Sequence, residues 1–125
     1  MKHERHYSTQ EANATLGWVQ EVLDGLREAR LGLNDEEARA ALTAAAPTNG
    51  GGAPGTVVSE AFLALRDGLM SLQEKGVVLR DLERGLVDFP SLREDQEIYL
   101  CWEEGEQEVA FWHDLEDGHA GRRPL

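Results

Sequence analysis

Cysteine, basic side chains and long apolar runs are scarce in this chain. A single cysteine, Cys101, among 125 residues excludes an internal disulfide and a zinc site built from several cysteines. No apolar run approaches the roughly 20 residues that span a bilayer, and no apolar signal core follows the polar start of the sequence. Because one cysteine also fits a reducing compartment, the sequence predicts a cytoplasmic protein without a membrane span.

The scarcity of basic residues restricts the kinds of partner. Twelve lysines and arginines stand against 24 acids, for a formal net charge of −12. Nucleic acids and anionic membranes are bound through basic patches, so general binding to either is not expected. Residues 77–118 hold 13 acids and 3 arginines, a net of −10. We interpret their acidic stretch at 103–108 as a charged sheet edge that resists strand addition, or as a surface for a divalent cation or a basic partner.

Two segments carry the apolar pattern of helices. In each, apolar residues recur at alternating steps of four and three, which indicates a heptad seam typical of coiled coils. The first predicts a helix over 9–33, with Ser8 and Glu11 as its capping box, and the second a helix over 57–76, ending near Gly76. Two such helices should pair antiparallel as a hairpin. The seams consist of Ala12, Leu16, Val19, Leu23, Leu26, Arg30 and Leu33, then Val58, Phe62, Leu65, Leu69 and Leu72.

The rest of the chain predicts a loop and a small sheet. Residues 34–56 suggest a short helix, with little apolar surface beyond Leu42, and a flexible loop rich in glycine and proline. After Gly76 the period changes to two, with β-type runs at 77–79, 86–89, 98–102 and 109–114 and a tail at 115–125. The sequence therefore predicts one α+β domain over 1–125: a long antiparallel helical hairpin followed by an antiparallel sheet of three or four strands.

Individual residues, rather than motifs, carry the functional signal. The sequence has no phosphate loop, CxxC pair, HExxH helix or GxSxG elbow. Asp88 lies inside an apolar β run, where an unpaired carboxylate is costly. It is therefore a metal ligand or a general base, or it has the structural role of holding a turn or pairing with an arginine such as Arg122 or Arg123. Cys101, in the middle of a strand, is interpreted as an inert buried residue, and the histidines at positions 3 and 6 receive no role.

Two further histidines extend the set of candidates. In a regular strand His113 would share the face of the apolar Val109. It is either a ligand or acid–base group, or a core histidine bonded to a backbone carbonyl. His113 and His119, with Asp88 or Glu106, would make a reasonable set for a divalent metal such as zinc, manganese or iron.

Short blocks along the chain resemble a known family. They read YS at 7–8, EAN at 11–13, WV at 18–19, GLVDFP at 85–90, YLCW at 99–102, GE at 105–106, WH at 112–113 and GR at 121–122. Together they resemble the uncharacterised bacterial family catalogued as domain of unknown function 2203, with residues 34–56 as an insertion.

The resemblance implies a small prokaryotic protein and brings no activity with it. It implies Asp88, Glu106, Trp112, His113 and Arg122 as the candidates for a shared ligand-binding site. The family pattern has an aromatic residue in place of His119, which counts against that histidine as a ligand.

Two functions remain open from the sequence. A two-helix hairpin with one sheet leaves apolar helix surface uncovered, which favours a non-enzymatic interaction or regulatory module that forms a homodimer; its protein partner is not indicated. The alternative is a metal- or small-ligand-binding protein, with an enzyme as one form of it, that uses Asp88, Glu106, His113 and Arg122 and takes a divalent metal as cofactor.

Overall fold

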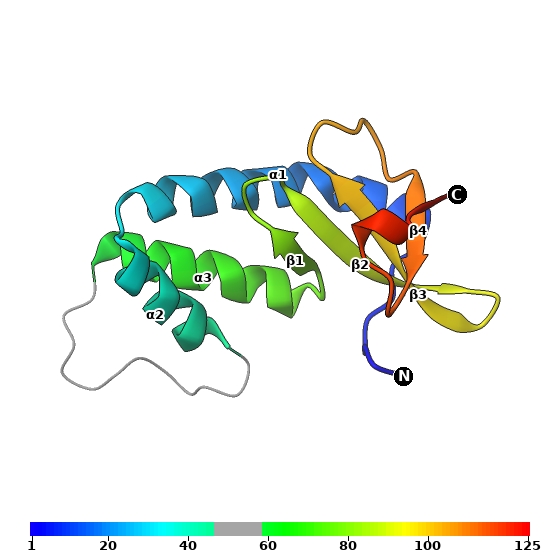
Figure 1. Cartoon of the computed structure of the whole chain (residues 1–125), viewed down its shortest axis with the longest axis horizontal. Helices are drawn as coiled ribbons and strands as arrows, with labels where there is room; N and C mark the ends of the chain where they lie inside the picture. Colours follow the sequence, from blue (N-terminus) through cyan, green and yellow to red (C-terminus); the bar gives the residue numbers. More distant parts are fainter. Residues whose placement is uncertain (47–58) are drawn as a thin grey trace.

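The computed structural model describes residues 1–46 and 59–125. Within these two ranges, three helices, α1 (Thr9–Leu31), α2 (Asp35–Ala45) and α3 (Glu60–Glu74), precede a five-stranded antiparallel sheet. Its strands are β1 (Val78–Asp81), β2 (Leu86–Arg93), β3 (Gln96–Glu103), β4 (Phe111–Asp114) and β5 (Arg123–Pro124), arranged in chain order. Figure 1 shows the sheet toward one end of α1, with both chain ends beside it. The predicted α+β class is confirmed.

Helix α1 begins as the sequence predicts. The Ser8 side chain accepts a hydrogen bond from the Glu11 amide, and the Glu11 carboxylate accepts one from the Ser8 amide. The seam residues Val19, Leu23 and Leu26 are at most 1 % exposed. They pack in a core shared with α3, which runs antiparallel to α1 (Figure 1). The helix ends at Leu31, slightly before the predicted boundary, because the chain turns at Gly32.

The prediction of a single helical hairpin is wrong, because a third helix packs against α3. Helix α2 has a capping box of its own, formed by Asn34 and Glu37. It buries Ala38, Ala41, Ala44 and Ala45, whereas Leu42 is 57 % exposed. A face made of alanines gives little hydrophobic contrast, so the sequence did not indicate that it would be buried. The predicted flexible loop falls largely on residues 47–58, outside the described residues.

Glycines on the helices have different surroundings. A Cβ added at Gly17 or Gly25 would meet nothing within 4 Å. A Cβ at Gly68 of α3 would lie 2.6 Å from Cδ2 of Leu26, a residue that is only 1 % exposed. Gly68 therefore permits the close approach of α1 and α3, and the other two glycines do not serve that purpose.

The sheet has two faces with different roles. Side chains alternate along each strand, and one face packs on the helices through Val87, Phe89, Ile98, Leu100 and Trp102. The other face, called the outer face below, carries the cross-strand pairs Asp88–Cys101, Tyr99–His113 and Cys101–Phe111. Residues 115–122 lie over part of the outer face.

The sheet has more strands than the sequence predicts. The predicted tail at 115–125 contains a short 3₁₀ helix, His119–Gly121, and strand β5, which pairs with β4. Three or four strands were predicted because a two-residue strand containing proline has no alternating pattern, although proline is tolerated at a sheet edge. Strand β4 begins only at Phe111, so Val109 is in the core while His113 is on the outer face.

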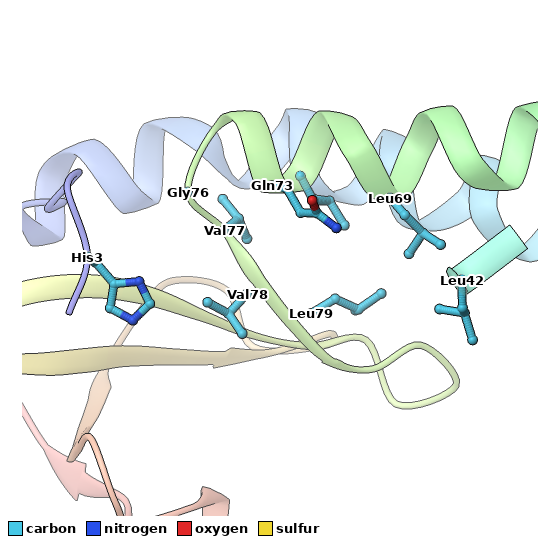
Figure 2. Close-up of a pocket in the computed structure, with 9 residues that line it drawn as sticks. His3, Leu42, Leu69, Gln73, Gly76, Val77, Val78 and Leu79 are labelled. Atoms are coloured by element: carbon cyan, nitrogen blue, oxygen red, sulfur yellow. The ribbon is translucent and has the colours of Figure 1, made fainter. Parts of the chain in front are cut away.

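An apolar groove runs beside the sheet edge formed by β1. It consists of two adjoining pockets of about 490 and 380 Å³, both lined by Leu42, Leu69 and Leu79. Figure 2 shows these side chains converging from α2, α3 and β1. Among the described residues, no helix is both long enough and apolar enough to cross a membrane.

Candidate functional site

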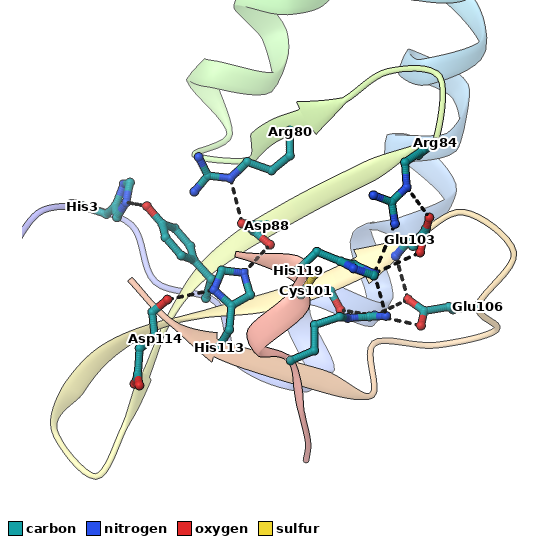
Figure 3. Close-up of polar contacts among 12 residues, drawn as sticks. His3, Arg80, Arg84, Asp88, Cys101, Glu103, Glu106, His113, Asp114 and His119 are labelled. Atoms are coloured by element: carbon teal, nitrogen blue, oxygen red, sulfur yellow. Dashed lines mark hydrogen bonds and ion pairs between the residues drawn. The ribbon is translucent and has the colours of Figure 1, made fainter. Parts of the chain in front are cut away.

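A buried aspartate–histidine pair occupies the middle of the outer face. Asp88 of β2 and His113 of β4 reach across β3, with Oδ1 of Asp88 3.1 Å from Nε2 of His113. The two residues are 2 % and 1 % exposed. The other ring nitrogen of His113, Nδ1, lies 2.8 Å from the carbonyl oxygen of Asp114. Figure 3 shows both contacts.

Further contacts hold both residues of the pair. A carbonyl oxygen only accepts hydrogen bonds, so Nδ1 of His113 donates to Asp114. The second oxygen of Asp88 accepts a hydrogen bond from Nε of Arg80 at 2.8 Å. Arg80 lies two residues after Val78, which is paired with Asp88, so the two side chains share one face of the sheet. The prediction that Arg122 or Arg123 is the arginine partner of Asp88 is therefore wrong.

Cys101 completes the cluster. It lies opposite Asp88 in β3, and its sulfur, an Asp88 oxygen and a His113 nitrogen all lie within 4.8 Å of one another. Burial raises the pKa of the Cys101 thiol to about 12, and the negative charge of Asp88 acts in the same direction. The thiol is therefore protonated at neutral pH. It becomes a thiolate only if a cation replaces its proton.

A pocket of about 350 Å³ gives solvent access to this cluster. Arg80, Asp88 and Cys101 line one side, and residues of the segment 115–119, including His119, line the other. Asp88 and Cys101 are thus the two members of the buried cluster, besides Arg80, that line the pocket.

Glu106 and Arg122 form a second, neighbouring cluster. Nη2 of Arg122 donates to both Glu106 oxygens, at 2.6 and 2.8 Å, and the guanidinium lies 4.1 Å from the centre of the Phe111 ring. Oε1 of Glu106 also accepts a hydrogen bond from the amide of Glu103 at 2.7 Å. These contacts fasten the β3–β4 loop to the C-terminal segment, which is a structural role.

His119 belongs to this second cluster. Its Nε2 lies 3.1 Å from Glu103 and 3.2 Å from Arg122. Arg84 donates to Glu103 at 2.9 Å, and this hydrogen bond lowers the pKa of Glu103. Arginines from other parts of the chain thus neutralise several acids that the sequence showed as one acidic stretch.

The structure therefore separates the predicted site residues. Asp88 and His113 come together, whereas Glu106, His119 and Arg122 lie beside them in the second cluster. Trp112 is not in the site. It packs on the helix side of the sheet. The guanidinium carbons of Arg93 and Arg123 lie 4.6 and 4.9 Å from the centre of its ring. Sequence reasoning missed Arg80 and interpreted Cys101 as an inert buried residue. Cys101 is indeed buried, and its position beside Asp88 follows once the strand register is known.

The N-terminal histidines also have defined partners. Glu97 accepts hydrogen bonds from the amides of Lys2 and His3, at 2.9 and 3.1 Å, and from the ring of His6 at 2.6 Å. Burial alone would raise the pKa of Glu97, but these hydrogen bonds lower it to about 2. The ring of His3 also bonds to the hydroxyl of Tyr99. The two histidines, given no role above, thus attach the N-terminal segment to β3.

Fold and site together define a class of protein: an α+β domain with a buried aspartate–histidine pair beneath a pocket on the outer face of a five-stranded sheet. The chain belongs to the family described as "Uncharacterized conserved protein (DUF2203)", whose model matches residues 5–125. The resemblance noted in the sequence is thereby confirmed. No curated protein and no solved structure matches the chain.

Proposed function

We propose that this protein binds a small polar ligand or ion in the pocket on the outer face. The observation that carries the proposal is the buried Asp88–His113 pair, in which Asp88 lines a pocket that opens to solvent. Buried charges often cost as much stability as they return, so stability alone does not explain why they are placed there. Charged groups in a cleft are also typical of binding sites.

The proposal is tested by titrating isotope-labelled protein with acetate, phosphate, ammonium, Mg²⁺, Ca²⁺ and Zn²⁺ while recording amide NMR spectra. At least one member of this panel should shift the amides of Asp88, Cys101 and His119 in the wild type. The shifts should disappear in Asp88→Asn. The control variant Asp67→Asn, an exposed position on α3, should keep them. If no member shifts these amides, or if the shifts persist in Asp88→Asn, the proposal is wrong.

The apolar groove favours a second function, self-association. The groove adjoins β1, the edge of the sheet, and its rim carries charges of both signs, including Arg30 and Glu83. In a two-fold contact between identical surfaces, residue i of one copy meets residue j of the other and the reverse, so a surface with both signs of charge can be complementary to itself. We therefore propose a second copy of this chain as the occupant, in agreement with the dimer expected from the helical seams.

Light scattering at micromolar concentration tests this second proposal. The wild type should be a dimer. Leu42→Glu should be a monomer, because it places a charge in the groove. Leu92→Glu, an exposed leucine in β2 that does not line the groove, should remain a dimer. A monomeric wild type, or a dimer that survives Leu42→Glu, would exclude the groove as the dimer interface.

A further inference from the structure

We infer that the ligand of this pocket is a divalent transition-metal ion of the zinc class, held by Asp88, Cys101 and His113. This inference rests on the proposed ligand-binding function and names the ligand. This set of ligands differs from the one that the sequence predicts. Cys101 is now a ligand, whereas Glu106 and His119 are not. Those two residues are engaged by Arg122 and Glu103 in the neighbouring cluster.

The spacing of the three ligand atoms suits such an ion. They all lie within 4.8 Å of one another, and the Asp88 and His113 atoms are 3.1 Å apart. Ligands of tetrahedral zinc, with bonds of about 2.0–2.3 Å, are separated by about 3.3–3.6 Å. Small side-chain rotations on a fixed sheet are therefore enough to bring the three atoms around one ion.

Outer contacts already orient two of the ligands. Nδ1 of His113 donates to the carbonyl of Asp114, which directs Nε2 toward Asp88 and Cys101. Arg80 binds the second oxygen of Asp88 and leaves Oδ1 facing the centre of the cluster. Metal-binding histidines and carboxylates are commonly held by such contacts to a carbonyl or a hydrogen-bond donor.

The donor atoms select the kind of metal. One imidazole nitrogen, one thiolate sulfur and one carboxylate oxygen suit Zn²⁺ and Co²⁺, whereas Mg²⁺ and Ca²⁺ prefer oxygen ligands alone. The pocket adjoins Asp88 and Cys101, so the fourth position of a tetrahedral ion is open to water or another small molecule. Three protein ligands with one open position are typical of catalytic rather than structural zinc.

Binding releases a proton from Cys101. A metal-bound cysteine is a thiolate, so the proton on Sγ leaves to solvent as the ion binds, and Nε2 of His113 binds the ion through its lone pair. The thiolate and the Asp88 carboxylate then balance the two positive charges of the ion.

Cobalt provides the sharpest test, because its visible spectrum reports the ligands. Full-length, tag-free protein is stripped with a chelator and titrated with Co²⁺, then with Zn²⁺. One equivalent of Co²⁺ should give the bands of a tetrahedral ion and a thiolate-to-cobalt charge-transfer band, and Zn²⁺ should displace it. Cys101→Ser should abolish the charge-transfer band and weaken Zn²⁺ binding by at least about 100-fold, beyond the loss typical of an outer contact.

Two matched variants separate this ligand set from the one suggested by the sequence. Glu106→Gln and His119→Ala should keep the wild-type spectrum and affinity. The inference is wrong if the wild type takes up neither metal, if its cobalt complex lacks the thiolate band, or if Glu106→Gln or His119→Ala loses the ion while Cys101→Ser retains it. If Cys101→Ser fails to fold, the thiolate-to-cobalt band of the wild type still shows whether Cys101 binds the metal.

The outcomes also distinguish this inference from the function it rests on. If acetate, phosphate or ammonium shifts the pocket amides but the wild type binds no transition metal, the metal inference fails and ligand binding stands. If neither a metal nor any other member of the panel binds, both fail.

Discussion

Asp88 holds the polar cluster of the outer face together. It is 2 % exposed and is the shared partner of Arg80 and His113. Replacing it by asparagine keeps the shape of the side chain but removes the counter-charge of Arg80 and the carboxylate that faces His113. Breaking a buried ion pair in this way costs about 3 kcal/mol or more. We therefore expect Asp88→Asn to lower the free energy of unfolding, measured in urea, by about that amount. Asp67→Asn should change it by less than about 0.5 kcal/mol, and equal effects of the two would contradict the pairing.

Glu97 gives the protein a specific sensitivity to acid. Its pKa is about 2 in the folded protein, against 4.5 for the free side chain. A lowered folded-state pKa stabilises the protein above pH 4.5, and this contribution is lost as the pH falls toward 2. Wild type should therefore exceed Glu97→Gln in unfolding free energy at pH 6, and the difference should shrink by pH 3. Glu108→Gln, at an exposed position, should show no such narrowing, and a constant difference for Glu97→Gln would refute the assignment.

At this scale the sequence reveals residues that stand out from their surroundings. Asp88 and His113 could be predicted as candidates because an acid and an imidazole are unusual within short β runs. Arg80 and Cys101 could not, because their importance depends on which residues lie opposite one another in the sheet. A shift of one residue in register would have turned Cys101 to the helix side.

The turn between β2 and β3 shows strain at the level of an element. Glu94 and Asp95 form a two-residue turn with φ of +52° and +65°, values that favour asparagine and glycine. The double substitution Glu94→Asn with Asp95→Gly should raise the free energy of unfolding by roughly 1 kcal/mol. The opposite kind of change, Gly85→Ala, should lower it, because Gly85 has a φ of +66° and its Cβ would lie 2.6 Å from Glu104. Thermal or urea unfolding measures both, and a destabilised turn variant would contradict the prediction.

Helical glycines provide a matched pair of variants. Gly25→Ala on α1 should stabilise the protein by about 1 kcal/mol, because alanine favours the helix and its Cβ would be unobstructed. Gly68→Ala on α3 should destabilise it by about 1–3 kcal/mol, since its Cβ would press on buried Leu26. Urea denaturation measures the free energy of unfolding of both variants, which should change in opposite directions. A stabilising Gly68→Ala would show that α1 and α3 can move apart at little cost.

An element could be predicted from the sequence when its buried positions are much more apolar than its exposed ones. Helices α1 and α3 have leucine-rich seams, so both could be predicted. The packing of α2 was missed because its buried face consists of alanines. Strand β5 was missed because Arg123 and Pro124 form pairs only with an already folded β4.

The charge of the whole molecule opposes folding. A net charge of −12 repels itself more strongly when the chain is compact. Raising NaCl from about 0.01 M to about 0.1 M shortens the screening length from about 30 Å to about 10 Å. We therefore expect the melting temperature to rise by about 2–4 °C, of the order of 1 kcal/mol. A fall would mean that ion pairs such as Arg27–Glu104 outweigh the repulsion.

The chain order of the sheet has a kinetic consequence. Each strand pairs with the next one in sequence, so the sheet can form by successive closures of short loops, which cost little entropy. The cluster around Asp88 runs from Arg80 to His113 in the sequence and is encoded by this one stretch of chain. Docking of the N-terminal segment, as in the hydrogen bond from the Tyr7 amide to the Pro90 carbonyl, closes a much longer loop and belongs to a slower step. The polar cluster therefore needs only local pairing to assemble, and the helical layer then excludes water from the other face of the sheet.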